Sequence, residues 1–158
     1  MLARAGQRRR LYLVGIALGV LLFFAISAVL ARVFSIDGTE RTAITLLIRD
    51  EAAGNSAAMI GRIKRCRSTP ACRARVAYDA SRLRRKGSVS ILQIQPSAGF
   101  SLTGTVGTAR VAWNAGSSLP IVQCVRVRRG GNALTGFHVE LLELSRRIPS
   151  GSNCPRRY

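Results

Sequence analysis

The fold is decided by residues 82–95, RLRRKGSVSILQIQ, where a helical pattern changes to an extended one. Four of the first five residues are basic, which suits the last turn of a helix because cations complement the helix dipole. Gly87 follows as a helix stop. From Ser88 onward, apolar residues alternate with polar ones at a period of two, which is typical of strands. We therefore expect the helices to precede this point and the strands to follow it.

The first expected helix of this region begins at Asp37. Asp37 and Glu40 have the spacing of an acidic capping box. Ile44, Leu47 and Ile48 then repeat at helical spacing, which predicts one buried stripe. A Gly-Asn pair ends or kinks this helix.

Two shorter helices are expected before the glycine stop. Residues 56–65 form the first, with an apolar face of Met59, Ile60 and Ile63. The second begins at Thr69, a good N-cap residue, and Pro70 suits its first position. The side chains expected to face the core from this helix are Ala74, Ala77 and Tyr78.

The remaining chain predicts four antiparallel strands, at residues 89–95, 100–113, 121–128 and 136–144. In the second strand the apolar residues occupy even positions early and odd positions late. Such a change of parity needs a bulge, and Gly107 is its expected place. The expected class is α+β, with helices packed on a curved four-stranded antiparallel sheet.

Residues 11–31 contain no charged side chain and are long enough to cross a bilayer core of about 30 Å. Four arginines precede this run and no acidic residue does, so the positive-inside rule places the N-terminus in the cytoplasm. The expectation is one transmembrane helix with the rest of the chain outside. The alternative is a cleaved signal peptide, whose apolar run is typically shorter, at about 7–15 residues.

These expectations divide the chain into five parts. They are a basic cytoplasmic stub (1–10), the transmembrane helix (11–31), a linker (32–36), an extracytoplasmic α+β domain (37–147) and a C-terminal tail tied by a disulfide (148–158). Only Lys64 and Lys86 among the 25 basic residues are lysines, and such arginine enrichment is typical of GC-rich genomes. We therefore expect the plasma membrane of a bacterium with a GC-rich genome.

All four cysteines follow the membrane segment, and outside the cytoplasm an even number indicates two disulfides. Three pairings are possible. The favoured pairing is Cys66 with Cys72, closing a short loop, and Cys124 with Cys154, tying the tail. A zinc site is the alternative, but the chain has no Cys-x-x-Cys pair and only one histidine. No metal and no cofactor are expected.

The net charge of +18 favours attraction to an anionic surface. The candidate residues for such binding are Arg82, Arg84, Arg85, Lys86, Arg126, Arg128 and Arg129. The expected partners are the lipid bilayer, an anionic lipid or wall polymer, and another membrane or envelope protein. Nucleic acid is not expected, because single-stranded nucleic acid needs exposed aromatics for stacking and most aromatics here read as core residues. The alternative is a merely solvated cationic surface.

The order of helices and strands, the long strand around Gly107 and the segment ARVAW at residues 109–113 resemble the nuclear-transport-factor-two-like cone superfamily. The chain is similar in particular to short membrane-anchored actinobacterial members, such as the mammalian-cell-entry-associated proteins. The resemblance implies a cone-shaped domain with a cavity, for which Tyr78, Asp79 and His138 are the candidate lining residues. From their spacing alone, we expect Asp79 to offset neighbouring arginines and His138 to face away from the core.

A second resemblance is to type IV pilins, which also combine a long apolar N-terminal helix, a four-stranded sheet and a C-terminal disulfide loop. The start of this chain departs from the pilin pattern. Arg8, Arg9 and Arg10 separate the only candidate cleavage glycine, Gly6, from the apolar run, and no acidic residue occurs before Asp37.

Together these patterns predict a membrane-anchored extracytoplasmic binding or scaffold domain that is not an enzyme, and no catalytic residue is assigned. One alternative is a small cavity-based enzyme of the cone fold. A further alternative is a pilin-like assembly subunit.

Overall fold

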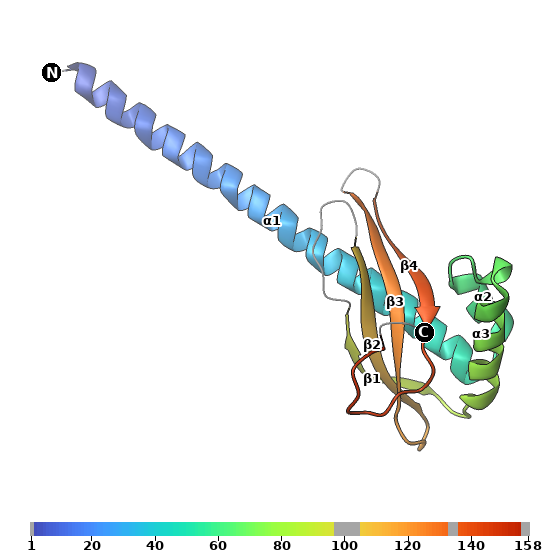
Figure 1. The fold of residues 1–158 in the computed structure, drawn as a ribbon. Coiled ribbons are helices and arrows are strands. Elements are labelled where there is room, and N and C mark those ends of the chain that lie inside the picture. The colour runs from blue at the N-terminus through green and yellow to red at the C-terminus, as the bar shows by residue number, and fades with distance from the viewer. Residues whose placement is uncertain (1, 97–104, 133–135, 156–158) are drawn as a thin grey trace. The chain divides into compact units, whose positions relative to one another are not determined.

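The computed structural model describes residues 2–96, 105–132 and 136–155. The chain divides into two compact units, Met1–Ser35 and Ile36–Tyr158. The fold is α+β, as expected: helices come first and an antiparallel sheet follows (Figure 1).

The first unit consists of a single helix, which is the N-terminal part of α1 (Leu2–Ala53). Within it, Tyr12–Ala31 is long and apolar enough to cross a membrane. Twenty residues at a rise of about 1.5 Å span about 30 Å, the thickness of a bilayer core. Large apolar side chains project outward all along this segment; Phe23 and Phe24, for example, are 66% and 63% exposed. This segment fits a single-pass transmembrane helix or a signal anchor.

The helix start expected at Asp37 is wrong, because residues 32–53 are all helical, and the boundary between the two units falls within the expected linker at residues 32–36. Residues 32–53 contain no proline, and the single Gly38 costs a helix only about 1 kcal/mol. The hydroxyl of Thr42 donates to the Gly38 carbonyl at 2.9 Å, inside the helix. The Asp37 carboxylate, instead of capping a helix, accepts from Arg129 of the sheet at 2.7 Å.

Two short elements follow α1: α2 (Ser56–Arg62) and a 3-10 turn, η1 (Cys66–Ser68). The side chain of Asn55 caps α2 by accepting from the Ala58 amide at 3.0 Å. The helix ends before the expected residue 65 because the chain becomes extended at Ile63. That extended residue pairs with Leu141 of the sheet, and the neighbouring Lys64 amide donates to the Leu141 carbonyl at 2.7 Å.

The third helix, α3 (Pro70–Arg82), begins where expected but is shorter than expected, and a different face of it is buried. The Thr69 hydroxyl does not cap it and donates instead to the Arg65 carbonyl. The helix stops at Arg82, so three of the basic residues expected in its last turn follow it as a loop. Its buried residues are Val76, Asp79 and Ala80, whereas Ala74, Ala77 and Tyr78 are exposed.

The sheet contains β1 (Val89–Gln95), β2 (Thr105–Ala115), β3 (Ile121–Asn132) and β4 (Gly136–Leu144), in the order β1-β2-β3-β4 and antiparallel throughout. β1 and β4 have the predicted bounds. The part of the second strand expected at residues 100–104 lies outside the described residues.

The bulge expected at Gly107 is absent from the described part of β2, whose register with β3 is unbroken from Thr105 to Trp113. Within the described part of β2, the buried residues from Ala109 onward are all at odd positions, and Val106, at an even position, is 47% exposed. The register shifts lie elsewhere. One falls between Ile91 and Gln93 in β1, and the other falls where Arg126 and Val127 pair with β4.

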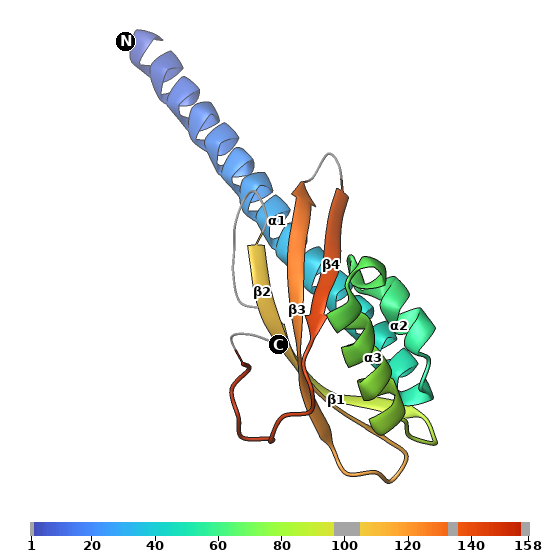
Figure 2. The same cartoon turned by 45° about the vertical axis from the view of Figure 1, so that its right-hand side comes forward.

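The core lies between one face of the sheet and the second half of α1. Ile44, Leu47 and Ile48 from the helix are fully buried against Trp113 and Val125 from the strands. Complete burial of such side chains stabilises the fold by about 1.5–3 kcal/mol each. α2 and α3 lie side by side beside β4 (Figure 2). Among the described residues, these side chains belong to one continuous hydrophobic cluster between the helices and the sheet.

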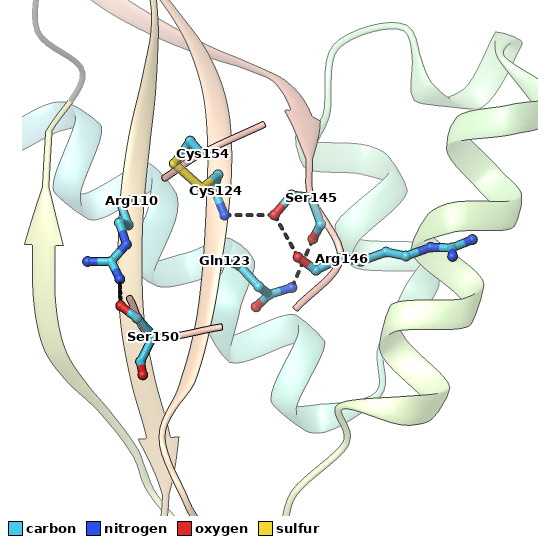
Figure 3. The surroundings of a disulfide bond; sticks show 7 residues. All are labelled: Arg110, Gln123, Cys124, Ser145, Arg146, Ser150 and Cys154. Carbon is cyan, nitrogen blue, oxygen red and sulfur yellow. Dashed lines mark hydrogen bonds between the residues drawn. A yellow bond between two sulfur atoms is a disulfide. The ribbon is translucent and has the colours of Figure 1, made fainter. Parts of the chain in front are cut away.

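Both favoured disulfides are present: Cys66–Cys72 and Cys124–Cys154, with Cα–Cα distances of 5.2 and 5.8 Å. The tail is also held by its backbone. After β4, the Ser145 amide donates to the Cys124 carbonyl and the Ile148 amide to the Val122 carbonyl, both at 2.8 Å. The tail therefore extends the β4 edge beside β3 before Cys154 joins it to Cys124 (Figure 3).

Candidate functional site

Two exposed arginines flank an exposed tyrosine on α3. Tyr78 is 46% exposed. The guanidinium of Arg82 lies 5.8 Å from the centre of its ring and that of Arg146 lies 5.3 Å from it. Each cation–π contact at an exposed site contributes about 0.5–1 kcal/mol, enough to favour this arrangement. We call Tyr78, Arg82 and Arg146, together with the exposed Arg84 and Lys86 that follow α3 in the chain, the α3 surface.

The basic charge of this surface is not balanced by acidic residues. All seven acidic residues lie in the described part of the chain after residue 35. Five of them form ion pairs, and the other two, Glu51 and Asp79, are buried. Of the 20 basic residues after residue 35, 18 lie in the described part and five take part in these ion pairs, which leaves 13 that do not.

The sequence-predicted anion-binding residues divide into two groups. Arg82, Arg84 and Lys86 are exposed and form none of the ion pairs, and Arg85 is half-buried, with its guanidinium donating to the carbonyls of Arg82 and Arg84. These four lie in or directly after α3. The structure thus supports a basic surface at this end of the domain.

The arginines of the second group, on β3, form ion pairs with acidic residues. Arg126 pairs with Glu143 at 3.4 Å and Arg128 with Glu140 at 3.6 Å. Arg129, whose side chain is only 13% exposed, pairs with Asp37 at 2.7 Å and with the buried Glu40 at 2.5 Å. Arg129 therefore joins the sheet to α1, and the expectation that it belongs to an exposed binding surface does not hold.

A buried polar network crosses the core from the sheet to α1. The Trp113 indole donates to Gln123 Oε1 at 2.9 Å. Gln123 Nε2 donates in turn to Glu51 Oε1 at 2.8 Å and to the Ser145 carbonyl at 3.3 Å. Burial raises the pKa of Glu51 to about 8. The hydrogen bond from Gln123 lowers this pKa, and the negative charge of Asp79 raises it further. Glu51 is therefore mostly protonated at neutral pH.

Asp79 is the second buried carboxyl group, with 1% of its surface exposed. Burial raises its pKa to about 6, and the nearby charges of Arg75 and Arg146 oppose that increase. Asp79 is thus mostly ionised at neutral pH beside the protonated Glu51. The expectation that Asp79 offsets neighbouring arginines agrees with the effect of Arg75, whose charge lowers the pKa of this buried carboxyl group.

The candidate cavity residues are not brought together. Tyr78 points to solvent, Asp79 is buried, and His138 is exposed on β4, where its ring lies against Gly130 of β3. None of these three residues lines the three surface pockets that we describe. Two of these pockets lie beside the tail and have volumes of about 550 and 450 Å³, and a third, of about 150 Å³, lies between α3 and β4. The structure therefore offers no acid–base pair in an open cavity among its described residues.

Sequence reasoning missed the buried Glu51, and its spacing could have revealed it. Ile44, Leu47, Ile48 and Glu51 follow the i, i+3, i+4, i+7 pattern of one helix face, so Glu51 falls on the buried stripe. Asp79 likewise shares a stripe with Val76. By contrast, no sequence signal places Arg146 over Tyr78, because that contact depends on the path of the chain after β4.

In comparisons with known proteins, no family model, no curated protein and no solved structure matches this chain.

Proposed function

We propose that this chain is a membrane-anchored binding protein whose second unit lies on the extracytoplasmic side and docks electrostatically on an anionic surface through the α3 surface. The observation that carries the proposal is the charge distribution: the acidic side chains are paired or buried, so the exposed basic ones keep their full charge. A juxtaposed anionic membrane attracts each such side chain by about 1 kcal/mol.

The placement rests on three supports. A 20-residue apolar segment precedes the folded unit, four arginines lie on its N-terminal side, and both disulfides lie beyond it. Positive charge is typical of the cytoplasmic flank, and disulfides persist in oxidising compartments. The order of helices followed by an antiparallel meander also supports a relationship to the cone superfamily, which stays a proposal. The separation of Tyr78, Asp79 and His138 favours a binding module over a cavity enzyme.

The test uses the full chain in nanodiscs of phosphatidylcholine. Binding to separate vesicles is measured by flotation, with vesicles of phosphatidylcholine alone or mixed in equal parts with phosphatidylglycerol. We expect binding to the anionic vesicles only, weakening as salt is added because exposed charges are screened. Absence of binding to anionic vesicles at low salt would refute docking on lipid.

A pair of matched variants locates the docking surface. R82Q/R146Q removes the two charges that flank Tyr78, and R41Q/R49Q removes two exposed charges from α1. At about 1 kcal/mol per charge, the first variant is expected to weaken binding about 30-fold, with a much smaller effect of the second. Equal losses of binding in the two variants would show that the chain binds through its overall positive charge and not through the α3 surface.

A further inference from the structure

A hollow beneath the C-terminal tail contains a basic side chain with no acidic partner. It has a volume of about 450 Å³, and we call it the tail hollow. Its lining residues are Gln95, Pro96, Thr108, Arg110 and residues 150–154. None of the seven acidic residues, all of which the structure describes, lies among them. The hollow is separate from the α3 surface, and its function does not depend on the proposal above.

Arg110 is fixed in this hollow by the sheet and the tail. It lies on β2, opposite Gln95 of β1 and opposite Cys124 of β3. Its neighbours Ala109 and Val111 are buried in the core, so its own side chain projects from the other face. There one Nη donates to the carbonyl of Ser150 in the tail (Figure 3).

The guanidinium retains unused hydrogen-bonding capacity. Its Nε–H is buried and has no hydrogen-bond partner among the described residues, and Arg110 forms no ion pair with any of them. A buried donor left unpaired costs about 1–3 kcal/mol, more for a charged group. A guanidinium presents five donors in a fork that matches the oxygens of carboxylate and phosphate.

The rest of the hollow suits a small polar ligand. The side chains of Thr108, Ser152 and Asn153 line it and can donate hydrogen bonds to an oxyanion. Gly151 leaves open space, because a Cβ atom added there would meet no atom within 4 Å. The Cys124–Cys154 disulfide holds the tail across the sheet, so this wall is covalently fixed.

We propose that the tail hollow is a binding site for a small oxyanion, the carboxylate or phosphate group of a ligand, with Arg110 as its anchoring residue. The oxyanion would pair with the guanidinium while the tail supplies neutral donors around it. Since the site depends on the tail, the Cys124–Cys154 disulfide stabilises it together with the backbone bonds of the tail.

The test is calorimetric titration of the full chain in phosphatidylcholine nanodiscs, in one arm with inorganic phosphate and in the other with N-acetylglycine. Saturable binding of either anion is expected, and the arm that binds more tightly identifies the ligand class. R110Q is expected to weaken binding about tenfold or more, as expected for loss of a charge-assisted hydrogen bond. R49Q, which removes an exposed arginine of α1, is the matched control.

A second variant keeps the test decisive if R110Q fails to fold. G151L adds a bulky apolar side chain to the lining of the hollow, at a position where a Cβ atom meets no neighbour, so it too is expected to weaken binding, with melting curves showing that the fold is retained. Absence of saturable binding in both arms would overturn the proposal. So would retention of binding in folded G151L, or an equal loss in R49Q, which would show that the anions bind to the general basic charge.

Discussion

Replacement of Glu51 by glutamine should make the stability of the folded unit less dependent on pH. Glu51 has an ordinary carboxyl pKa of about 4.5 when unfolded and a pKa of about 8 when folded. Because the folded pKa is the higher one, the folded state retains a proton that the unfolded state loses. The free energy of unfolding therefore falls as pH rises from 4.5 to 8 and changes no further, through this group, outside that window.

The size of the effect follows from the shift. Each unit of pKa difference corresponds to about 1.4 kcal/mol, so the full window corresponds to about 5 kcal/mol as an upper estimate. E51Q keeps an amide oxygen that can accept from Gln123 but cannot ionise. We expect E51Q to match the wild type within about 1 kcal/mol at about pH 5 and to be more stable by about 3–5 kcal/mol at about pH 8.5.

The chain carries its own probe for this measurement. Its single tryptophan, Trp113, is fully buried and hydrogen-bonded to the same Gln123 that contacts Glu51. Denaturant unfolding of the full chain in detergent, followed by tryptophan fluorescence at both pH values, gives the free energies. E143Q, at an acidic residue with a 47% exposed side chain, is the control and should show no such dependence. An E51Q effect of equal size at both pH values would refute the buried, protonated carboxyl.

Three further predictions follow from the same contacts. As pH rises from about 4 to about 6, D79N should become more stable relative to the wild type by about 1–2 kcal/mol, because burial raises the pKa of Asp79 to about 6 and ionisation of this group then destabilises the wild type. Unfolding curves across that range test this. R129M should cost about 3 kcal/mol, because it removes an ion pair from the buried Glu40, and a loss below about 0.5 kcal/mol in denaturant would contradict this role. The double variant C124S/C154S should lose about 3–4 kcal/mol through opening of a 30-residue loop, measurable as a lower melting temperature, whereas an unchanged melting temperature would mean that the tail is held by its backbone bonds alone.

The elements that local patterns determine were predicted well. β1 and β4 have the predicted bounds, and both disulfides have the favoured pairing. Strand alternation and short-loop cysteine spacing are properties of the chain that need no knowledge of the tertiary structure. The α+β class follows from the change of period after Gly87.

The errors arise where tertiary contacts outweigh local signals. Asp37 has the sequence position of a helix cap, but its carboxylate accepts a hydrogen bond from Arg129, 92 residues away in the sequence. The helix α1 includes Asp37 and does not begin there. Tyr78 was expected to face the core together with Ala74 and Ala77, yet the buried stripe of α3 contains Val76 and Asp79. Local propensity could not show that the aromatic would be stabilised outside by two arginines.

The candidate site was predictable in its charge but not in its layout. The basic run at residues 82–86 is visible in the sequence, and it is exposed as expected except for the half-buried Arg85. The equally basic run on β3 is occupied by ion pairs, because the acidic residues of β4 and α1 lie opposite it. The tail hollow also depends on long-range pairing, since Arg110 and Ser150 are 40 residues apart.

We propose that the folded unit lies outside the cytoplasm and is anchored by one helix. The most direct test is digestion of intact bacterial spheroplasts, expressing the full chain with an N-terminal epitope tag, by a membrane-impermeant protease. We expect the unit after residue 35 to be degraded while the tag with its apolar helix is protected until the membrane is permeabilised. Protection of the folded unit in intact spheroplasts, with loss only after permeabilisation, would mean that the unit lies in the cytoplasm.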